Sequence, residues 1–179
     1  MIAAHAVLRA ATADKHHQVD HAFSHFDLGN RQSYGSFLIA HARVLGAVEG
    51  RLAAAPTGFP QTRTRLAHLA GDLEGFAQPL PDPMPMPYAL GDAALWGMLY
   101  VAEGSRLGGG VLAARVGQGL PRSFLAAVHL KGEWRTLLAA LDAAALSQPP
   151  SWSDAMAEGA RRTFDLYMDS AGIEAPMLA

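Results

Sequence analysis

The sequence predicts an all-α bundle of helices. Three observations favour this fold class. Apolar residues recur at helical spacing along most of the 179 residues, strand-like alternation with β-branched residues is almost absent, and the connections between the amphipathic segments are short. We expect one domain spanning residues 1–179, because a chain of this length can bury a substantial core by itself.

The first half of the chain contains three expected helices. The first spans roughly residues 3–25, before the turn DLGN, with an apolar face formed by Leu8, Thr12, Val19, Phe23 and Phe26. The second has a stripe formed by Tyr34, Phe37, Leu38, His41, Leu45, Val48 and Leu52. The third is marked by Leu66, Leu69, Leu73 and Phe76. Each stripe has the spacing of an amphipathic helix that buries one face.

The second half begins after a proline-rich segment, QPLPDPMPMP (78–87), which must be an extended loop. A glycine-interrupted helical segment follows at about 90–116, and a fifth helix is expected from about 122 to 145. After the break SQPP, the last helix is expected near 152–171.

Composition excludes several classes of function. Fourteen basic and 16 acidic side chains give a net charge of −2, so we expect no nucleic-acid partner. The absence of cysteine excludes disulfides, thiolate nucleophiles and cysteine metal sites, and it is consistent with a reducing cytoplasm. The chain shows neither a signal-peptide pattern nor an apolar run long enough to span a membrane. We therefore expect a cytoplasmic protein.

The stretch EGSRLGGG (103–110) is unusual because helical segments flank it on both sides. Each glycine inside a helix costs about 1 kcal/mol relative to alanine. The sequence keeps Gly104, Gly108, Gly109 and Gly110 despite that cost. Either another group packs closely against the backbone here, or the helix bends.

Five of the eight histidines lie in the first 25 residues. His17, His21 and His25 align along one face of the first helix, but no HExxH pattern accompanies them, so a solvated polar stripe explains them better than a zinc site. His16 instead shares a face with Leu8, Thr12 and Val19.

Two interpretations of His16 remain open from the spacing alone. It is either a core histidine that bonds a backbone carbonyl or an axial haem ligand. Asp20, four residues later, is placed to accept a proton from the far ring nitrogen, as partners of metal-bound histidines do. The glycine-rich segment offers a surface for a flat ligand such as haem.

Two motifs resemble the haem oxygenases. LRAATADKHHQVD (8–20) is similar to the first-helix signature of that family, and it places the axial iron ligand at His16. LYVAEGSRLGGGVL (99–112) is similar to the distal-helix signature, in the EGSxLGG form of bacterial members that serve bacteriophytochromes. The likeness extends more weakly through WRTLLAALDA (134–143) and ARRTFDLY (160–167), so it covers most of the chain.

The resemblance implies a haem oxygenase bundle with a distal helix kinked at its glycines. Backbone at Gly104, Gly108 and Gly109 would then lie over the porphyrin, while Gly97 and Gly110 remain open to a role in helix packing. Ser105 stands where mammalian relatives carry an aspartate that anchors a water network. The expected haem contacts are Arg9, Thr12, His16, Asp20, Tyr100, Arg135 and Phe164. Arg9 and Arg135 are also explained as solvated arginines and Phe164 as core. Tyr100 and Tyr167 are candidate pocket hydroxyls, whereas Arg106 faces either the pocket or solvent.

The function that the resemblance implies is the cleavage of haem to biliverdin, iron and carbon monoxide. Haem is then both cofactor and substrate, O2 is the oxidant, and a ferredoxin or a reductase supplies electrons. A bacteriophytochrome is the expected acceptor of the bilin. Two alternatives use the same residues or the same fold: a haem carrier or sensor without turnover, and a helical scaffold that binds something else.

Overall fold

The computed structural model describes residues 3–86, 88 and 90–175, and every regular element in this part of the chain is helical. The prediction of an all-α protein is confirmed. The elements are α1 (Ala4–Phe23), α2 (Arg31–Ala53), α3 (Leu66–Glu74), α4 (Asp92–Gly104), the 3₁₀ turn η1 (Ser105–Gly108), α5 (Gly109–Ala113), α6 (Ser123–Ala126), α7 (Glu133–Ala145) and α8 (Pro150–Glu174).

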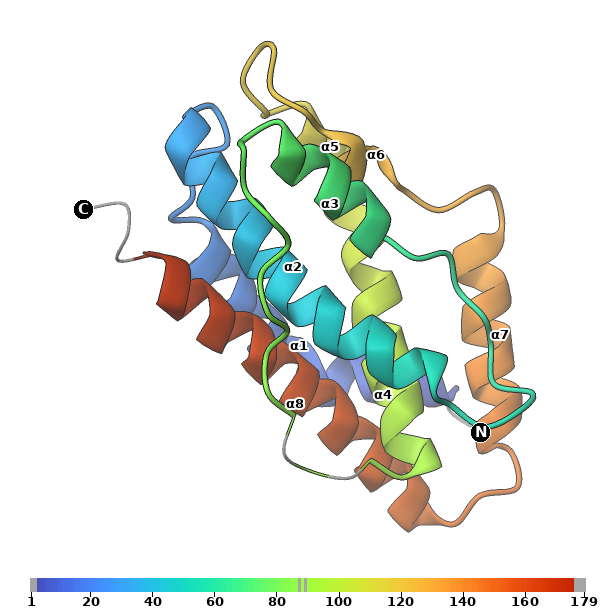
Figure 1. Cartoon of the computed structure of the whole chain (residues 1–179). Helices are drawn as coiled ribbons and strands as arrows, with labels where there is room; N and C mark the ends of the chain where they lie inside the picture. Colours follow the sequence, from blue (N-terminus) through green and yellow to red (C-terminus); the bar gives the residue numbers. More distant parts are fainter. Residues whose placement is uncertain (1–2, 87, 89, 176–179) are drawn as a thin grey trace.

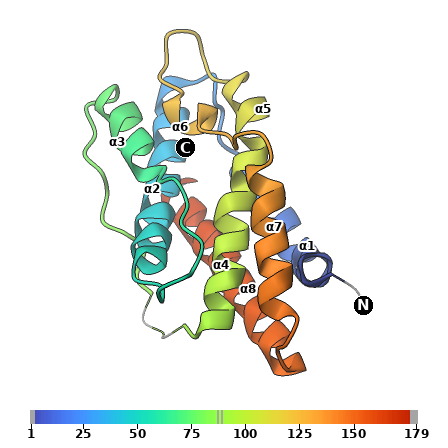
Figure 2. The ribbon, with the colours of Figure 1, turned by 90° about the vertical axis from the view of Figure 1, so that its right-hand side faces the viewer.

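The long helices form three layers. α4 and α8 lie in the middle, α2 and α3 lie on one side of them, and α1 lies on the other (Figures 1 and 2). The proline-rich segment runs along the outer side of α2, where the Met84 amide donates to the Arg43 carbonyl at 2.9 Å. This segment is extended as predicted, although Pro87 lies outside the described residues. Within the described residues, each helix is too short or too polar to cross a bilayer.

Local sequence signals explain where the helices begin. The side chain of Asn30 accepts a hydrogen bond from the Ser33 amide at 3.1 Å and so caps α2. Pro150 occupies the first turn of α8, where its missing N–H costs nothing. Gly132 precedes α7 with φ +86°, a left-handed conformation that glycine adopts without strain.

One helix that the sequence predicts is two helices in the structure. The sequence predicts a continuous helix over about 122–145, whereas the structure has α6, a non-helical segment at 127–132 and α7. The break has a tertiary cause that periodicity does not report. The carbonyls of Ala127 and Val128 accept hydrogen bonds from the side chains of Arg106 and Arg63, which lie far away in the sequence.

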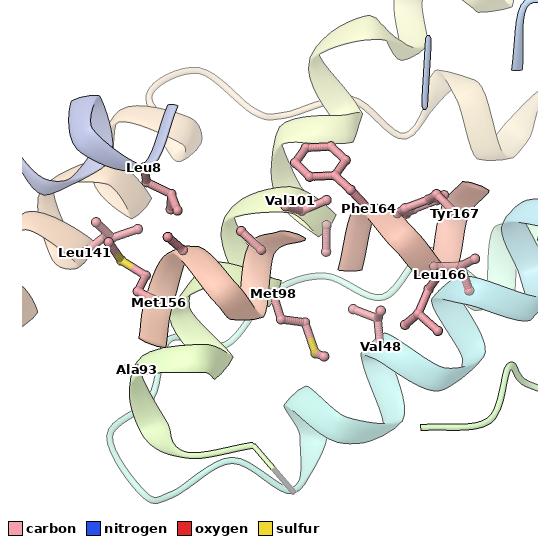
Figure 3. Packing of buried hydrophobic residues seen from close by; sticks show 14 residues of the cluster. Leu8, Val48, Ala93, Met98, Val101, Leu141, Met156, Phe164, Leu166 and Tyr167 are labelled. Atoms are coloured by element: carbon pink, nitrogen blue, oxygen red, sulfur yellow. The ribbon is translucent and has the colours of Figure 1, made fainter. Parts of the chain in front are cut away.

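α4 and α8 approach until their backbones touch. A Cβ on Gly97 would lie 1.9 Å from the Met156 carbonyl oxygen, and one on Gly159 would lie 2.2 Å from the Ala94 carbonyl oxygen. Helix packing, one of the two explanations left open for Gly97, is therefore its role. Around this contact α1, α2 and α7 add Leu8, Val48 and Leu141 to a buried apolar cluster (Figure 3).

Gly97→Ala should lower the free energy of unfolding by roughly 1–3 kcal/mol, because the new methyl group forces the two backbones apart. Gly50 lies in α2 with nothing within 4 Å of an added Cβ. Gly50→Ala is therefore the matched control and should stabilise the protein by about 0.5–1 kcal/mol. Urea denaturation measures both variants, and a neutral Gly97→Ala would show that the α4–α8 contact is looser than described.

Candidate functional site

His16 lies in the C-terminal half of α1, where it has one free ring nitrogen. Its Nδ1 is 3.0 Å from Asp20 Oδ2, the geometry that the sequence predicted, so Nε2 is the atom that a metal would take. The side chain is 61% exposed, and its ring packs edge-on against Phe164 of α8, with centroids 5.9 Å apart. His16 therefore borders the apolar stripe instead of being buried in it.

No cluster of metal-ligating side chains accompanies His16. Among the described residues, no group of three or more His, Asp or Glu side chains could hold a metal ion. His17, His21 and His25 are exposed, in agreement with a solvated stripe. A metal bound at His16 would thus have one protein ligand, which is how proteins bind the iron of haem through a single imidazole.

The distal segment, which we define as α4 from Gly104 through η1 and α5, presents an exposed apolar stripe. Gly104, Leu107, Gly108 and Val111 share the i, i+3, i+4, i+7 spacing of one helix face. Leu107 is 57% exposed and Val111 72% exposed. A Cβ on Gly108 would meet nothing within 4 Å, and one on Gly104 would meet only Trp134 at 3.6 Å. Such a face is suited to a flat apolar ligand.

Gly109 and Gly110 have different surroundings. A Cβ on Gly109 would lie 2.5 Å from the Leu125 carbonyl oxygen of α6, so close packing of α5 against α6 accounts for this glycine. The sequence grouped Gly109 with the glycines over the porphyrin, but its missing side chain faces α6. A Cβ on Gly110 would be in ordinary contact with Val128, at 3.9 Å.

A second face of the distal segment lines a small polar cavity. The cavity measures about 30 Å³, which is room for roughly two water molecules. His41, Arg65, Ser105 and Gly109 contribute to its wall. Ser105 Oγ donates to the Ala102 carbonyl at 2.8 Å and accepts from an Arg65 Nη2–H at 2.9 Å. Ser105 is thus in contact with a guanidinium.

Arg65 is held in place by a carboxylate from α2. Glu49 accepts hydrogen bonds from the Arg65 amide at 2.7 Å and from the Thr64 hydroxyl, and so fixes the start of α3. Arg65 is 3% exposed, and its Nη2 also donates to the Ala102 carbonyl at 2.6 Å. Its Nε and the Tyr167 hydroxyl are buried with no hydrogen-bond partner among the described residues. Water in the cavity beside them would satisfy such groups.

His41 supplies a neutral imidazole to the cavity. Its Nδ1 lies 2.9 Å from the Phe37 carbonyl, so Nδ1–H donates and Nε2 keeps its lone pair. Burial lowers the pKa of His41 from 6.5 to about 4, an effect that the bond to Phe37 only partly opposes. The ring is packed among aromatic neighbours that include Phe23 and Phe124.

The remaining predicted haem contacts differ in how free their side chains are to touch a ligand. Thr12 is buried, and its hydroxyl donates to the Leu8 carbonyl at 2.8 Å, so it offers a pocket no free donor. Arg9 and Arg135 are exposed, as side chains that meet propionates would be. Tyr100 packs against Trp134; burial raises its pKa, and nearby Arg9 lowers it less.

Arg106 faces neither the exposed stripe nor solvent, and it lines the same small cavity as Arg65 and Ser105. It is 2% exposed, and Glu103 and the Ala127 carbonyl accept its hydrogen bonds. The sequence left its orientation open, and the structure places it in a buried network away from the exposed stripe.

Comparison with known proteins agrees with this arrangement. The crystal structure of NO- and CO-bound haem oxygenase from Neisseria meningitidis superimposes with a TM-score of 0.83 over 98% of this chain and 94% of that chain, at 24% sequence identity. The chain has the haem oxygenase fold. A curated haem oxygenase from Xanthomonas campestris pv. campestris (strain 8004) is 41% identical over 86 residues, which are 45% of this chain. The match spans about half (51%) of the length of that relative. No family model matches the chain.

These findings confirm the resemblance to haem oxygenases that the two sequence motifs carry. The residues present also fit a haem. One imidazole has Nε2 free, and the exposed stripe contains a glycine whose missing Cβ leaves open space. α1 makes its main contacts with α8 and α7, whereas α5, the last part of the distal segment, packs on α6, so the two are held by different neighbours.

Protonation of His41 should destabilise the fold in acid. Because the folded state favours the neutral ring, the stability that His41 contributes is fully present above pH 6.5 and is lost as the pH falls toward 4. A pKa change of this size corresponds to about 3 kcal/mol. Urea denaturation between pH 7.5 and 4 should therefore show a smaller loss for His41→Gln than for the wild type. Identical pH profiles would contradict a buried neutral His41.

Proposed function

We propose that this protein is a haem oxygenase that cleaves haem to biliverdin, iron and carbon monoxide. One observation carries the proposal: an exposed histidine with an oriented free nitrogen and a glycine-bearing apolar stripe occur together in the haem oxygenase fold. Haem, when bound, supplies the iron that activates O2 and the ring that is oxidised.

His16 is the proposed axial ligand. Asp20 Oδ2 lies 3.0 Å from Nδ1, a position that favours the Nδ1–H tautomer, leaves Nε2 as the ligand atom and raises the basicity of the ring. Phe164 supports the ring edge-on from α8. A neutral imidazole donates less electron density than a thiolate does, so His16 would leave a bound iron with less electron density than the cysteine ligand of P450 enzymes does.

Gly104 and Gly108 are the proposed distal contacts. Without a Cβ at these positions, backbone can approach a macrocycle closely while leaving space for a diatomic ligand. Leu107 and Val111 add apolar surface on the same stripe. The stripe contains no side-chain acid, so a proton has to come from elsewhere.

The polar cavity is the proposed source of that proton. Ser105 Oγ has a lone pair left, and His41 Nε2 is an acceptor, so water in the cavity would donate to them. Arg65 Nε would in turn donate to such a water. The positive charge of Arg65 stabilises the hydroxide left when such a water gives up its proton, and so makes the water a better proton donor. Ser105 therefore acts together with Arg65, where mammalian relatives use an aspartate.

The propionates, electron source and product acceptor are also proposals. Arg9 and Arg135 are exposed cations for the propionates. A ferredoxin or a reductase would supply electrons, and a bacteriophytochrome would accept the bilin. The electron donor rests on the resemblance to the haem oxygenases, and the bilin acceptor rests on the form of the EGSRLGG motif.

Turnover is the test. Hemin is added to the purified protein, followed by ascorbate or a ferredoxin and its reductase in air, with catalase present to remove free peroxide. The proposal predicts a histidine-type Soret band that decays as biliverdin, ferrous iron and carbon monoxide appear together. A stable Soret band without bilin would make the protein a haem carrier or sensor, and no Soret shift would contradict haem binding.

His16→Ala should abolish the histidine-type haem spectrum, because the only proposed axial ligand is lost. The adjacent His17 is exposed on the same helix, so His17→Ala is the matched control and should leave the spectrum intact. Hemin titration followed by absorption and resonance Raman spectroscopy measures both. An unchanged spectrum in His16→Ala would refute the assignment.

Gly108→Leu should retain the Soret band but lose most bilin formation, since the new side chain fills the space above the haem. Gly50→Leu, at another open helical glycine far from the stripe, controls for the cost of the substitution itself. The measurements are carbon monoxide affinity and bilin yield. Full activity in Gly108→Leu would mean that the distal face lies elsewhere.

A further inference from the structure

The 3₁₀ turn Ser105–Gly108 interrupts the distal segment and needs outside support. Hydrogen bonds in 3₁₀ turns have poorer geometry than those in an α-helix, so such turns are uncommon within helices unless something sustains them. The stripe offers no such support, since Leu107 and Gly108 are exposed. Side chains on the other side of the turn provide it.

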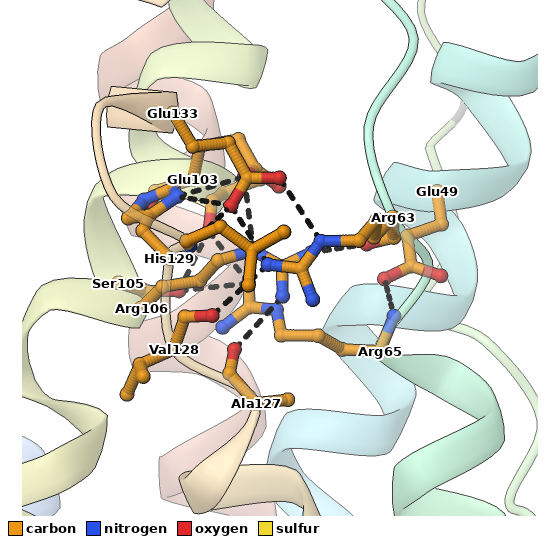
Figure 4. A network of polar contacts seen from close by, with 12 residues as sticks. Glu49, Arg63, Arg65, Glu103, Ser105, Arg106, Ala127, Val128, His129 and Glu133 are labelled. Atoms are coloured by element: carbon orange, nitrogen blue, oxygen red, sulfur yellow. Dashed lines mark hydrogen bonds and ion pairs between the residues drawn. The ribbon is translucent and has the colours of Figure 1, made fainter. Parts of the chain in front are cut away.

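Arg106 ties the turn to two separate segments. Its side chain is 1% exposed. Nε donates to Glu103 Oε2 at 2.9 Å, Nη1 donates to the Ala127 carbonyl at 2.9 Å, and Nη2 donates to the Arg63 carbonyl. The turn is thereby joined both to the segment before α3 and to the segment before α7 (Figure 4).

Arg63 locks those two segments to each other. Its guanidinium donates to both carboxylate oxygens of Glu133, at 2.9 and 2.7 Å, and to the Val128 carbonyl at 3.0 Å. The bonds from Arg63 and the Leu130 amide lower the pKa of Glu133 to about 2, so this carboxylate is charged at neutral pH. The two segments that accept hydrogen bonds from Arg106 are therefore bonded to each other.

His129 bonds the backbone where α4 ends. Its ring is 8% exposed, and Nε2 lies 2.9 Å from the Glu103 carbonyl oxygen, so Nε2–H donates. Nδ1 has no hydrogen-bond partner, but it lies 3.8 Å from a Glu103 carboxylate oxygen and 3.5 Å from one of Glu133. The ring also packs on Trp134, which lies against Gly104.

We propose that Arg106 and His129 are positioning residues that fix the distal turn, and with it the height of Gly104 and Gly108 above the haem. This inference rests on the proposed function. Arg106 bonds outward from the turn, and His129 bonds the Glu103 carbonyl just before it. Both side chains are buried, unlike those of the exposed stripe, so they set the backbone without touching the ligand. Loss of either would let the last turn of α4 and the 3₁₀ turn shift.

Substitutions at His129 separate its hydrogen bond from its bulk. Glutamine places an amide N–H near the position of Nε2, asparagine places one near Nδ1, and leucine offers no donor. Lys131→Ala, at an exposed position of the same segment, is the control. Arg106→Lys keeps the charge at the turn but reduces its hydrogen bonds, so it tests the second residue without leaving Glu103 unpaired.

Hydrogen exchange of the haem-free protein is the first readout. Amides of residues 103–110 should exchange about tenfold faster in His129→Leu and His129→Asn, and in Arg106→Lys, than in the wild type. His129→Gln and Lys131→Ala should stay within about twofold. Equal rates in all variants would overturn the proposal, and so would faster exchange that extended equally through α2, because that would be general destabilisation.

The carbon monoxide complex gives the second readout. The C–O stretching band should shift or broaden in His129→Leu and His129→Asn, and His129→Gln should restore it. An unchanged band in His129→Leu would overturn the proposal even if exchange had accelerated. If the wild type bound no haem, the proposed function would fail, while the exchange experiment would still report whether His129 and Arg106 hold the turn.

Discussion

The close approach of α4 to α8 is the constraint on which the rest of the structure depends. Gly97 and Gly159 let the two backbones touch, which no residue with a side chain permits at that distance. This contact fixes the middle layer of the bundle. α1 packs on one side of α8 and α2 on the other (Figure 2). The distal segment continues from the C-terminal end of α4. The position of His16 relative to that segment therefore depends on the glycine contact that joins α4 to α8.

The distal segment has three kinds of surroundings: solvent, a small cavity and a network of buried polar groups. One stripe is exposed, apolar and partly glycine, and it suits a flat ligand. A second face lines a cavity with a neutral imidazole and a buried guanidinium. On the remaining side, Arg106 and His129 hold the turn in a network of charged groups. Arg106 also lines the cavity, so the cavity and the network meet at this residue of the 3₁₀ turn.

Local sequence predicted the features that local physics decides. The helical segments follow from apolar spacing, and the contact between His16 and Asp20 follows from the i, i+4 geometry of one helix. The break before α7 could not be predicted this way, because Arg63 and Arg106 create it from distant segments. The close packing of Gly109 could not be predicted for the same reason, since the carbonyl it accommodates belongs to α6.

Two groups of the site could not be assigned to it from the sequence. Arg65 lies 40 positions before Ser105, and only the fold brings the guanidinium to the hydroxyl. His41 did leave a signal: it is a histidine within an apolar helix stripe, the same feature that drew attention to His16. Nothing in the spacing distinguishes a histidine that lines a cavity from one that borders the surface, because that depends on which helices cover it.

We expect haem to lie between His16 and the glycine stripe of the distal segment. A crystal structure of the hemin-loaded protein would show where it binds. Iron should be bonded to His16 Nε2, with the backbone of Gly104 and Gly108 over the opposite face of the porphyrin. Iron bonded to His17, His21 or His25, or a porphyrin away from the distal segment, would contradict this arrangement.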